Sequence, residues 1–404
     1  MLSLHRRAWL GLLTAALLTA AQVAQADVVT EANARAADIA SRHPATPISV
    51  RMMAIVQVSV FEAANAVTGR YPPQRVKLTA PPGASLEAAV AAASRSALLK
   101  LMPAQQAAID ADYQAALKPL PDGRAKTDGI AVGEQAAAAV VASCADDGAM
   151  APNTYRPHTT PGVYVPTMFP AVPHWGKRRP WVMTSGAQFR PGPPPSLTSD
   201  VWTRDFDEIK AIGAKNSTRR TPEQTAIAQF WEATAPAVYW PVARSVAEAP
   251  GRDATDNARL LAVAAMAMDD ALIAVFDAKY TYNLWRPVTA IRNAEGDARD
   301  PGWIPFIDTP LHPEYPCAHC IVSASLGTVL EAEIGSGPTP LLRSSSSTAG
   351  GAVRTWKTVS DFVQEVAVAR IYDGVHYRTS TEVGTEMGKK VGALAAKSVP
   401  KPTR

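Results

Sequence analysis

The chain has 404 residues, of which 47% are hydrophobic, and its 40 Lys and Arg nearly balance its 36 Asp and Glu. This composition excludes a disordered or fibrous protein. Because no basic run is longer than residues 177–179, the charge gives no support for nucleic-acid binding, and we expect no nucleic-acid partner.

The first 26 residues resemble a secretory signal peptide. A pair of arginines is followed by an apolar run over 8–21 and by small residues at Ala24 and Ala26. The run is shorter than the roughly 20 residues that a membrane anchor needs. The arginine pair also resembles a twin-arginine signal, but we favour the general secretory route. We therefore expect a periplasmic or secreted protein, with no membrane span in the rest of the chain.

Residues 27–149 are predicted to form an N-terminal helical part, because apolar residues recur there at spacings of three and four. The expected helices cover 48–66, 85–101, 103–117 and 127–144. The next segment, 150–199, holds 11 of the 34 prolines, several aromatic residues and no acidic residue. So long a segment without helical period is either a disordered linker or a functional loop. Since linkers usually lack aromatic residues, we interpret it as a Pro-rich loop that covers a pocket.

Residues 200–400 are predicted to form a C-terminal helical part that is continuous with the N-terminal part in one globular unit. We see no apolar alternation long enough for a sheet, so the predicted fold class is all-α. Breaks at Pro287 and Gly374 and a Gly/Ser/Pro-rich loop over 335–351 separate the helices. The expected helices cover 201–213, a capped helix from 221, 256–285, 319–334 and, as the last strong one, 359–372.

Two basic residues near the end of the predicted helix 256–285 are the first candidates for chemistry. Lys279 and Arg286 are seven residues apart, which would place both side chains on one face of a helix. Two cations beside apolar and aromatic residues favour a bound anion. The simpler alternative is a solvated basic stripe.

The second candidate is the segment 312–319, in which prolines precede an apolar helix. A helix N-terminus binds anions, and His319 there could exchange a proton with a bound oxyanion. A histidine at that place is more often structural. Cys317 and Cys320 could also form a redox pair, but the strand of a thioredoxin-like unit, the histidine of a haem attachment site and the second cysteine pair of a zinc site are missing.

The third candidate is the pair Arg370 and His376. Six helical residues would place them about 120° apart, so both can face one ligand only if the helix breaks between them. Gly374 permits such a break.

In chain order, the three segments read Lys, six residues, Arg-Pro; then Pro, two residues, His; then Arg, five residues, His. This order resembles the superfamily shared by vanadium-dependent haloperoxidases and type 2 phosphatidic acid phosphatases, which includes secreted bacterial acid phosphatases. The resemblance covers most of the chain after the signal and implies the large helical bundle of that superfamily.

The resemblance implies a role for each matched residue. His376 would bond the vanadium of vanadate in a peroxidase, or form a phosphohistidine in a phosphatase, and His319 would be the general acid and base. The oxyanion would be held by Lys279, Arg286, Arg370, Cys317 and the backbone N–H of Ala318. His312, seven residues before His319, would contribute to the substrate pocket, as in bromoperoxidases of the superfamily.

Three residues depart from the pattern. Cys317 and Ala318 stand where the superfamily has Ser and Gly, so a hydroxyl donor and some backbone freedom are lost. Ser380 stands where many members have an Asp that orients the last histidine, so the partner of His376 cannot be named from the sequence. The redox state of the cysteines and the oligomeric state also stay open.

The sequence favours a haloperoxidase that uses vanadate, peroxide and halide. Its length, its long helical N-terminal half and His312 support that reading. A secreted phosphatase that hydrolyses phosphomonoesters without a cofactor is the first alternative, and a non-catalytic oxyanion-binding protein is the second.

Overall fold

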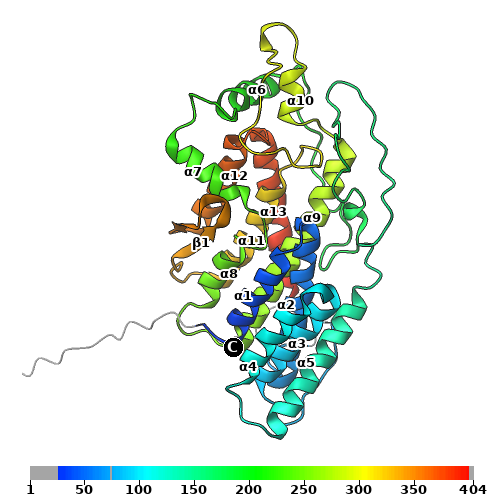
Figure 1. The fold of residues 1–404 in the computed structure, drawn as a ribbon, viewed down its shortest axis with the longest axis vertical. Coiled ribbons are helices and arrows are strands. Elements are labelled where there is room, and N and C mark those ends of the chain that lie inside the picture. The colour runs from blue at the N-terminus through cyan, green and yellow to red at the C-terminus, as the bar shows by residue number, and fades with distance from the viewer. Residues whose placement is uncertain (1–25, 73–74, 400–404) are drawn as a thin grey trace, which may run out of the picture.

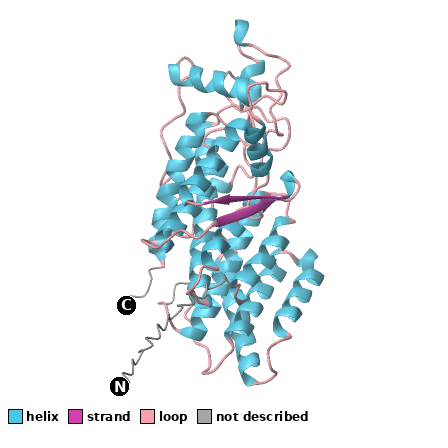
Figure 2. Cartoon of the chain, turned by 90° about the vertical axis from the view of Figure 1, so that its left-hand side faces the viewer, coloured by secondary structure: helices cyan, strands magenta, loops and turns pink. Residues whose placement is uncertain are grey.

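The computed structural model describes residues 26–72 and 75–399. Residues 1–25 of the predicted signal lie outside the described residues. The described chain consists of thirteen α-helices, short 3₁₀ turns and one two-stranded sheet (Figures 1 and 2), which confirms the all-α prediction. In chain order the helices are α1 (Val28–Ser41), α2 (Thr46–Thr68), α3 (Leu86–Leu101), α4 (Gln106–Leu117), α5 (Arg124–Ser143), α6 (Asp200–Ile212), α7 (Pro222–Glu232), α8 (Trp240–Ala247), α9 (Ala254–Tyr282), α10 (Pro287–Arg292), α11 (Ala318–Ile334), α12 (Val359–Tyr372) and α13 (Arg378–Ser398).

Helix α9 is the centre of the bundle. Asp253 caps its first turn, and nearly every residue from Thr255 to Lys279 is buried. A helix that is apolar on all sides must be surrounded by others, and α9 packs against α2, α11 and α13. Figure 1 shows α3 to α5 at one end of the molecule and α6 and α10 at the other.

Helix α2 is the one described helix that is long and apolar enough to cross a membrane. However, 83% of its most apolar window is buried inside the fold. That degree of burial is typical of a core helix.

The Pro-rich segment 150–199 runs along the outside of the bundle (Figure 1) and is tied to α9 by buried charges. Arg178 donates to Asp269 at 2.8 Å, and both side chains are almost fully buried. The carboxylate of Asp270 accepts hydrogen bonds from the backbone N–H groups of 181–183. The segment is therefore anchored at a fixed place on the helix that carries Lys279.

Helices α11 and α13 pack with their backbones in close contact. Glycines occur at every fourth position of α13, on the side that faces α11, and a side chain at any of them would collide with that helix. A Cβ at Gly384, Gly388 or Gly392 would lie 2.6, 2.4 or 2.5 Å from the carbonyl oxygen of Cys317, Ile321 or Ser325, respectively.

Three sequence predictions about the elements were wrong. The helix predicted over 256–285 ends at Tyr282, because Asn283 takes a left-handed conformation with φ of 52°. Two antiparallel strands, β1 (Leu342–Ser346) and β2 (Ala352–Trp356), lie within and directly after the predicted loop 335–351, where no strand was expected. Helix α13 was not predicted, because its glycines lower helix propensity and its packing partner is distant in sequence.

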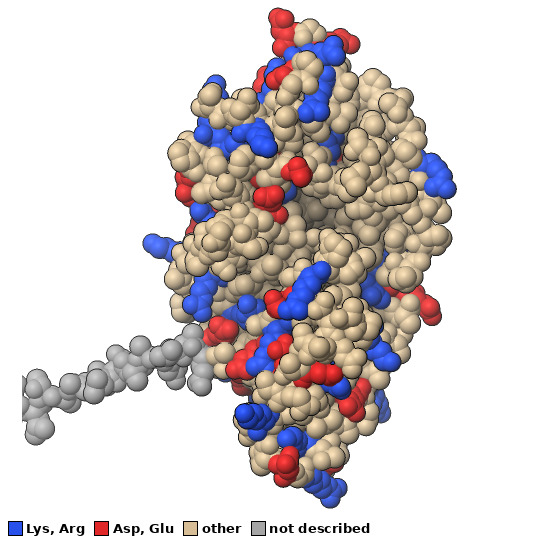
Figure 3. Space-filling model, viewed as in Figure 1, with Lys and Arg blue, Asp and Glu red and all other residues tan. Residues whose placement is uncertain are grey.

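Acidic and basic side chains are mixed over the surface shown in Figure 3, and no large patch of one sign covers that face. A mixed surface of this kind provides no extended basic footprint for a polyanion. The expected absence of a nucleic-acid partner stays a prediction.

Candidate functional site

Residues from the second and third candidate segments meet around one cavity of about 600 Å³. The C-terminal pair Arg370 and His376 lines it together with His319 from the start of α11. Ala171 and Val172 of the Pro-rich segment also line it. Residues more than 200 positions apart in the chain thus form one site.

The two cations of the first segment are held by the second. Lys279 Nζ donates to the backbone carbonyls of Pro313 and Glu314, each at 2.8 Å, and Arg286 Nε donates to the carbonyl of His312 at 2.9 Å. The expected shared helix face is wrong, because α9 ends at Tyr282 and Arg286 lies in extended backbone before α10. Common hydrogen-bond acceptors in the loop, rather than helical spacing, bring these cations together.

Burial makes these cations electrostatically costly. It lowers the pKa of Lys279 well below its ordinary value, and the charges of Arg286 and Arg370 lower it further. Burial likewise lowers the pKa of Arg286 to about 10, although Glu314 opposes this. A bound anion would relieve the repulsion between the cations, so the cluster favours one.

The third segment enters the site through a broken helix, as the sequence predicted. Helix α12 ends at Tyr372, and Gly374 follows with φ of 78°. Arg370 pairs with Asp373 at 2.7 Å and donates to the carbonyl of Trp231 at 2.8 Å. Among the described residues, its buried Nε has no hydrogen-bond partner.

The contacts of His376 define its tautomer. Its Nε2 lies 3.3 Å from Nη1 of Arg286, which can only donate, so Nε2 carries a lone pair. The ring proton must then be on Nδ1, which lies 2.8 Å from Oε1 of Glu314. Burial, with Arg286 and Lys279 next in importance, lowers the pKa of His376 well below its ordinary value, so the ring is neutral.

His319 lies in the first turn of α11 and faces the same cavity. Burial and the nearby Arg370 lower its pKa well below the ordinary value, while a hydrogen bond with the backbone of Ala233 opposes that shift. Its Nε2 is buried and has no partner within the described chain. Ala318 begins α11 and also lines the cavity, where the first N–H groups of a helix lack carbonyl partners. This helix end can therefore both bind an anion and exchange a proton.

Cys317 forms a disulfide with Cys320, and both residues are fully buried. A disulfide sulfur has no proton to donate, and Cys317 is not among the residues that line the cavity, so the structure does not bring Cys317 to the site as the resemblance implied. The remaining cysteine, Cys144, is a buried free thiol. A disulfide accords with the oxidising compartment to which the predicted signal would lead.

Glu314 is the residue at the site that the sequence did not single out. Burial raises its pKa to about 7, although Lys279 and Arg286 oppose the rise. Its contact with His376 supplies the partner that the sequence could not name, whereas the Ser380 hydroxyl lies 3.5 Å from the same ring nitrogen. The carboxylate comes from another segment of the chain, 62 positions away, so local spacing offered no signal for it.

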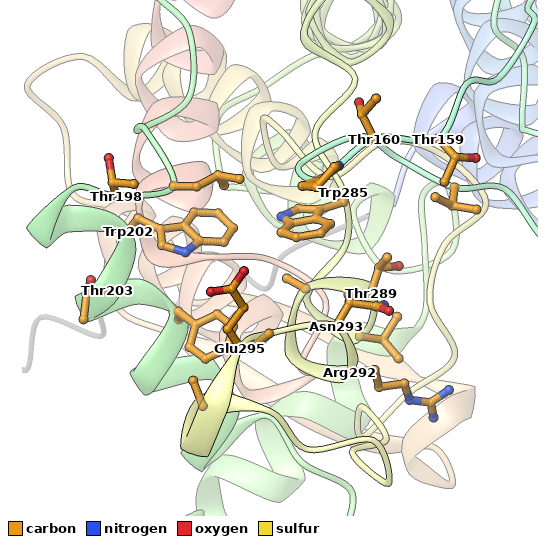
Figure 4. Close-up of a pocket in the computed structure, with 18 of the residues that line it drawn as sticks. Thr159, Thr160, Thr198, Trp202, Thr203, Trp285, Thr289, Arg292, Asn293 and Glu295 are labelled. Carbon is orange, nitrogen blue, oxygen red and sulfur yellow. The ribbon is translucent and has the colours of Figure 1, made fainter.

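A larger cavity of about 1030 Å³ is lined in part by Trp202 and Trp285. Figure 4 shows the indole rings of Trp202 and Trp285 side by side in it, with Glu295 below them. Its described lining includes none of the predicted site residues. We therefore assign the chemistry to the smaller cavity, where unpartnered polar atoms and buried cations converge.

Comparisons with known proteins find relatives that are described as vanadium-dependent haloperoxidases. Residues 259–403, which contain the three candidate segments, match a family model described as the VCPO second helical-bundle domain. A vanadium chloroperoxidase from Curvularia inaequalis is 27% identical over 182 residues, which cover 37% of this chain and 30% of that protein. The chain thus matches less than a third of the length of this curated relative.

Two solved structures share the fold over nearly the whole chain. The first, described as a bacterial vanadium-dependent iodoperoxidase, has a TM-score of 0.80 and 24% identity, and the match covers 94% of this chain and 99% of that one. The second, a holo-type bacterial vanadium-dependent chloroperoxidase, has a TM-score of 0.70 and 16% identity, with coverages of 90% and 95%. The predicted type of helical bundle is therefore confirmed.

Proposed function

Since the chain belongs to the superfamily of vanadium-dependent haloperoxidases and type 2 phosphatidic acid phosphatases, we propose that it is a vanadate-dependent haloperoxidase that oxidises halide with hydrogen peroxide. The observation that carries the proposal is the state of His376. Its Nε2 is unprotonated and lies at a cavity beside buried cations, as a ligand of an oxyanion's central atom must.

The residues present fit a tetrahedral oxyanion. Nε of Arg370 and Nε2 of His319 are buried polar atoms that lack partners in the described chain, and both residues line the cavity. Lys279, Arg286 and Arg370 would neutralise the oxygens, and His376 would bond vanadium. When bound, vanadate supplies a Lewis acid that activates peroxide without a change of oxidation state.

Each histidine would have a separate task. His376 would offer its Nε2 lone pair to the central atom, and Nη1 of Arg286, 3.3 Å from that nitrogen, would donate to an oxygen of the anion. His319, which is neutral, accepts the proton of incoming peroxide at Nε2. His312 lies 3.0 Å from Nη2 of Arg286 and limits where that guanidinium can turn.

The same geometry also suits a phosphatase. His376 would attack phosphorus, and His319, once protonated, would protonate the leaving alcohol. The predicted secretory signal supports this alternative. The disulfide at Cys317 instead supports the second alternative, a non-catalytic oxyanion-binding protein, because it removes a donor from the site.

The test compares both reactions in one preparation. We expect the purified protein to oxidise bromide or iodide with peroxide, with a rate that saturates as vanadate is added. Hydrolysis of a phosphomonoester that vanadate inhibits, without halide oxidation, would identify the phosphatase. Saturable vanadate binding without either reaction would identify the non-catalytic protein.

Binding of sulfate should be accompanied by proton uptake at neutral pH. The pKa values of Lys279 and His319 are lowered in the free protein, and a dianion between the cations must raise them, so the protein gains protons on binding. Sulfate is the probe because it does not itself titrate near neutrality. Calorimetry in buffers of different ionisation enthalpy measures the uptake, and affinity should rise from about pH 8 to about pH 6. Proton release, or an affinity independent of pH, would contradict this electrostatic description.

A further inference from the structure

We propose that Glu314 is the positioning residue of His376: its carboxylate holds the imidazole in the Nδ1–H tautomer and directs the Nε2 lone pair to the oxyanion. The identity of the oxyanion that Nε2 would bind rests on the proposed function. The effect of Glu314 on the tautomer of His376 does not depend on the proposed function.

The geometry around the carboxylate is specific. Oε1 of Glu314 accepts a hydrogen bond from Nδ1 of His376 at 2.8 Å and another from the backbone N–H of Tyr377 at 3.0 Å. Glu314 and His376 are 0% and 1% exposed, so water does not compete for these contacts. Since the two donors belong to adjacent residues, the carboxylate is fixed relative to both the ring and its backbone.

Glu314 also connects His376 to Lys279. Its backbone carbonyl accepts from Nζ of Lys279 at 2.8 Å, while its side chain holds the imidazole. Arg286 donates to the carbonyl of His312, two residues earlier, and so holds the same short segment. A displacement of Glu314 would therefore move the cation and the histidine together.

A carboxylate suits this position better than a neutral acceptor. A carboxylate that accepts from one nitrogen of an imidazole increases the basicity of the other, and loss of such a partner typically costs about 10–100-fold in metal affinity or activity. Lys279 and Arg286 offset part of the cost of burying its charge. The arrangement provides a more basic Nε2 without placing a carboxylate next to the oxyanion.

Ser380 offers an independent way to restore the carboxylate. It lies one helical turn after His376, with Oγ 3.5 Å from Nδ1. An aspartate there would bring a carboxylate to the same ring nitrogen. We expect Ser380→Asp to compensate for the loss of Glu314.

The first measurement is ¹⁵N NMR of histidine-labelled, ligand-free protein. We expect one His376 tautomer in the original protein, protonated at Nδ1. We expect a mixture of tautomers in Glu314→Leu, because the contact of Arg286 with Nε2, at 3.3 Å, is longer than the 2.8 Å contact that is lost. Glu314→Gln keeps an acceptor oxygen with nearly the same shape, so it should keep the tautomer, and it carries the affinity measurement below if the leucine variant does not fold. The matched control is Glu62→Leu, because Glu62 is a 2% exposed carboxylate that accepts a backbone hydrogen bond from Arg75, and it should leave His376 unchanged.

The second measurement is the affinity for orthovanadate by calorimetry. Glu314→Gln should bind about 10–100-fold more weakly, and Ser380→Asp in the Glu314→Gln background should recover most of the loss. Glu62→Leu should bind as the original protein does.

The outcomes distinguish the positioning role of Glu314 from the proposed function of the site. An unchanged tautomer in Glu314→Leu, or unchanged vanadate affinity in Glu314→Gln, would overturn the role of Glu314. A mixed tautomer in Glu314→Leu, with no vanadate or phosphate binding by any variant or by the original protein, would overturn the proposed function and leave the role of Glu314 intact.

Discussion

Replacement of His376 by alanine should abolish halide oxidation and any phosphomonoester hydrolysis. The proposed reactions both need a bond from Nε2 to vanadium or phosphorus, and alanine offers no atom for it. We expect activity at the level of the uncatalysed reaction even with saturating vanadate. Retained bromide oxidation would show that the oxyanion is bound elsewhere.

The matching variant His319→Ala separates bonding from proton transfer. It leaves His376 and the cations in place, so vanadate binding should persist while the rate falls by about 10²–10⁴-fold, the usual contribution of one general acid or base. Calorimetry and steady-state rates measured on the same preparations distinguish the two effects. Equal loss of binding and rate in both variants would contradict separate roles for the two histidines.

The substitution Gly374→Ala should have the second large effect. An alanine there would be in the left-handed region, at φ of 78°, and its Cβ would lie 2.3 Å from the carbonyl oxygen of Gly213. Left-handed strain of about 1–2 kcal/mol and overpacking of about 1–3 kcal/mol should lower the free energy of unfolding by about 2–5 kcal/mol. Because Gly374 lies between Arg370 and His376, vanadate affinity should fall as well. Chemical denaturation and calorimetry measure the two effects.

Gly350→Ala is the control for backbone strain alone. Gly350 also has a positive φ, of 64°, but no described atom lies within 4 Å of the position that a Cβ would take. We expect a loss of about 1–2 kcal/mol and unchanged vanadate affinity. Equal losses of stability at the two positions would mean that the contact between Gly374 and Gly213 does not matter.

Helices whose signals are local could be predicted from the sequence. The range predicted for α12, 359–372, agrees with the structure, and the capping residues at Thr221 and Gln224 form the expected capping box at the start of α7. Elements that depend on distant partners could not. The glycines of α13 suggest a poor helix until the backbone of α11 lies against them, and β1 contains a run of serines without apolar alternation.

The site residues could be selected from the sequence because their spacing resembles a known pattern, but their geometry could not. The structure brings His376, His319 and Arg370 to one cavity and places Lys279 and Arg286 beside it, although the reason expected for the last two was wrong. Glu314 could not be selected, because its carboxylate acts through a contact between segments. A sequence pattern records which residues recur, whereas a hydrogen bond across the fold depends on how the loops are placed.

The backbone contact between α11 and α13 has a consequence for how such a site can change. His319 lies in the first turn of α11, and the residue after His376 is the N-cap of α13, so the two histidines stand at neighbouring ends of one docked helix pair. Gly384 fixes that end by packing on the carbonyl of Cys317. The packing of α11 against α13 therefore sets the spacing between the two histidines. The segments at 171–172 and 307–311 form other parts of the cavity wall. Changes in these loops can alter which molecules enter while the distance over which a proton must move stays constant.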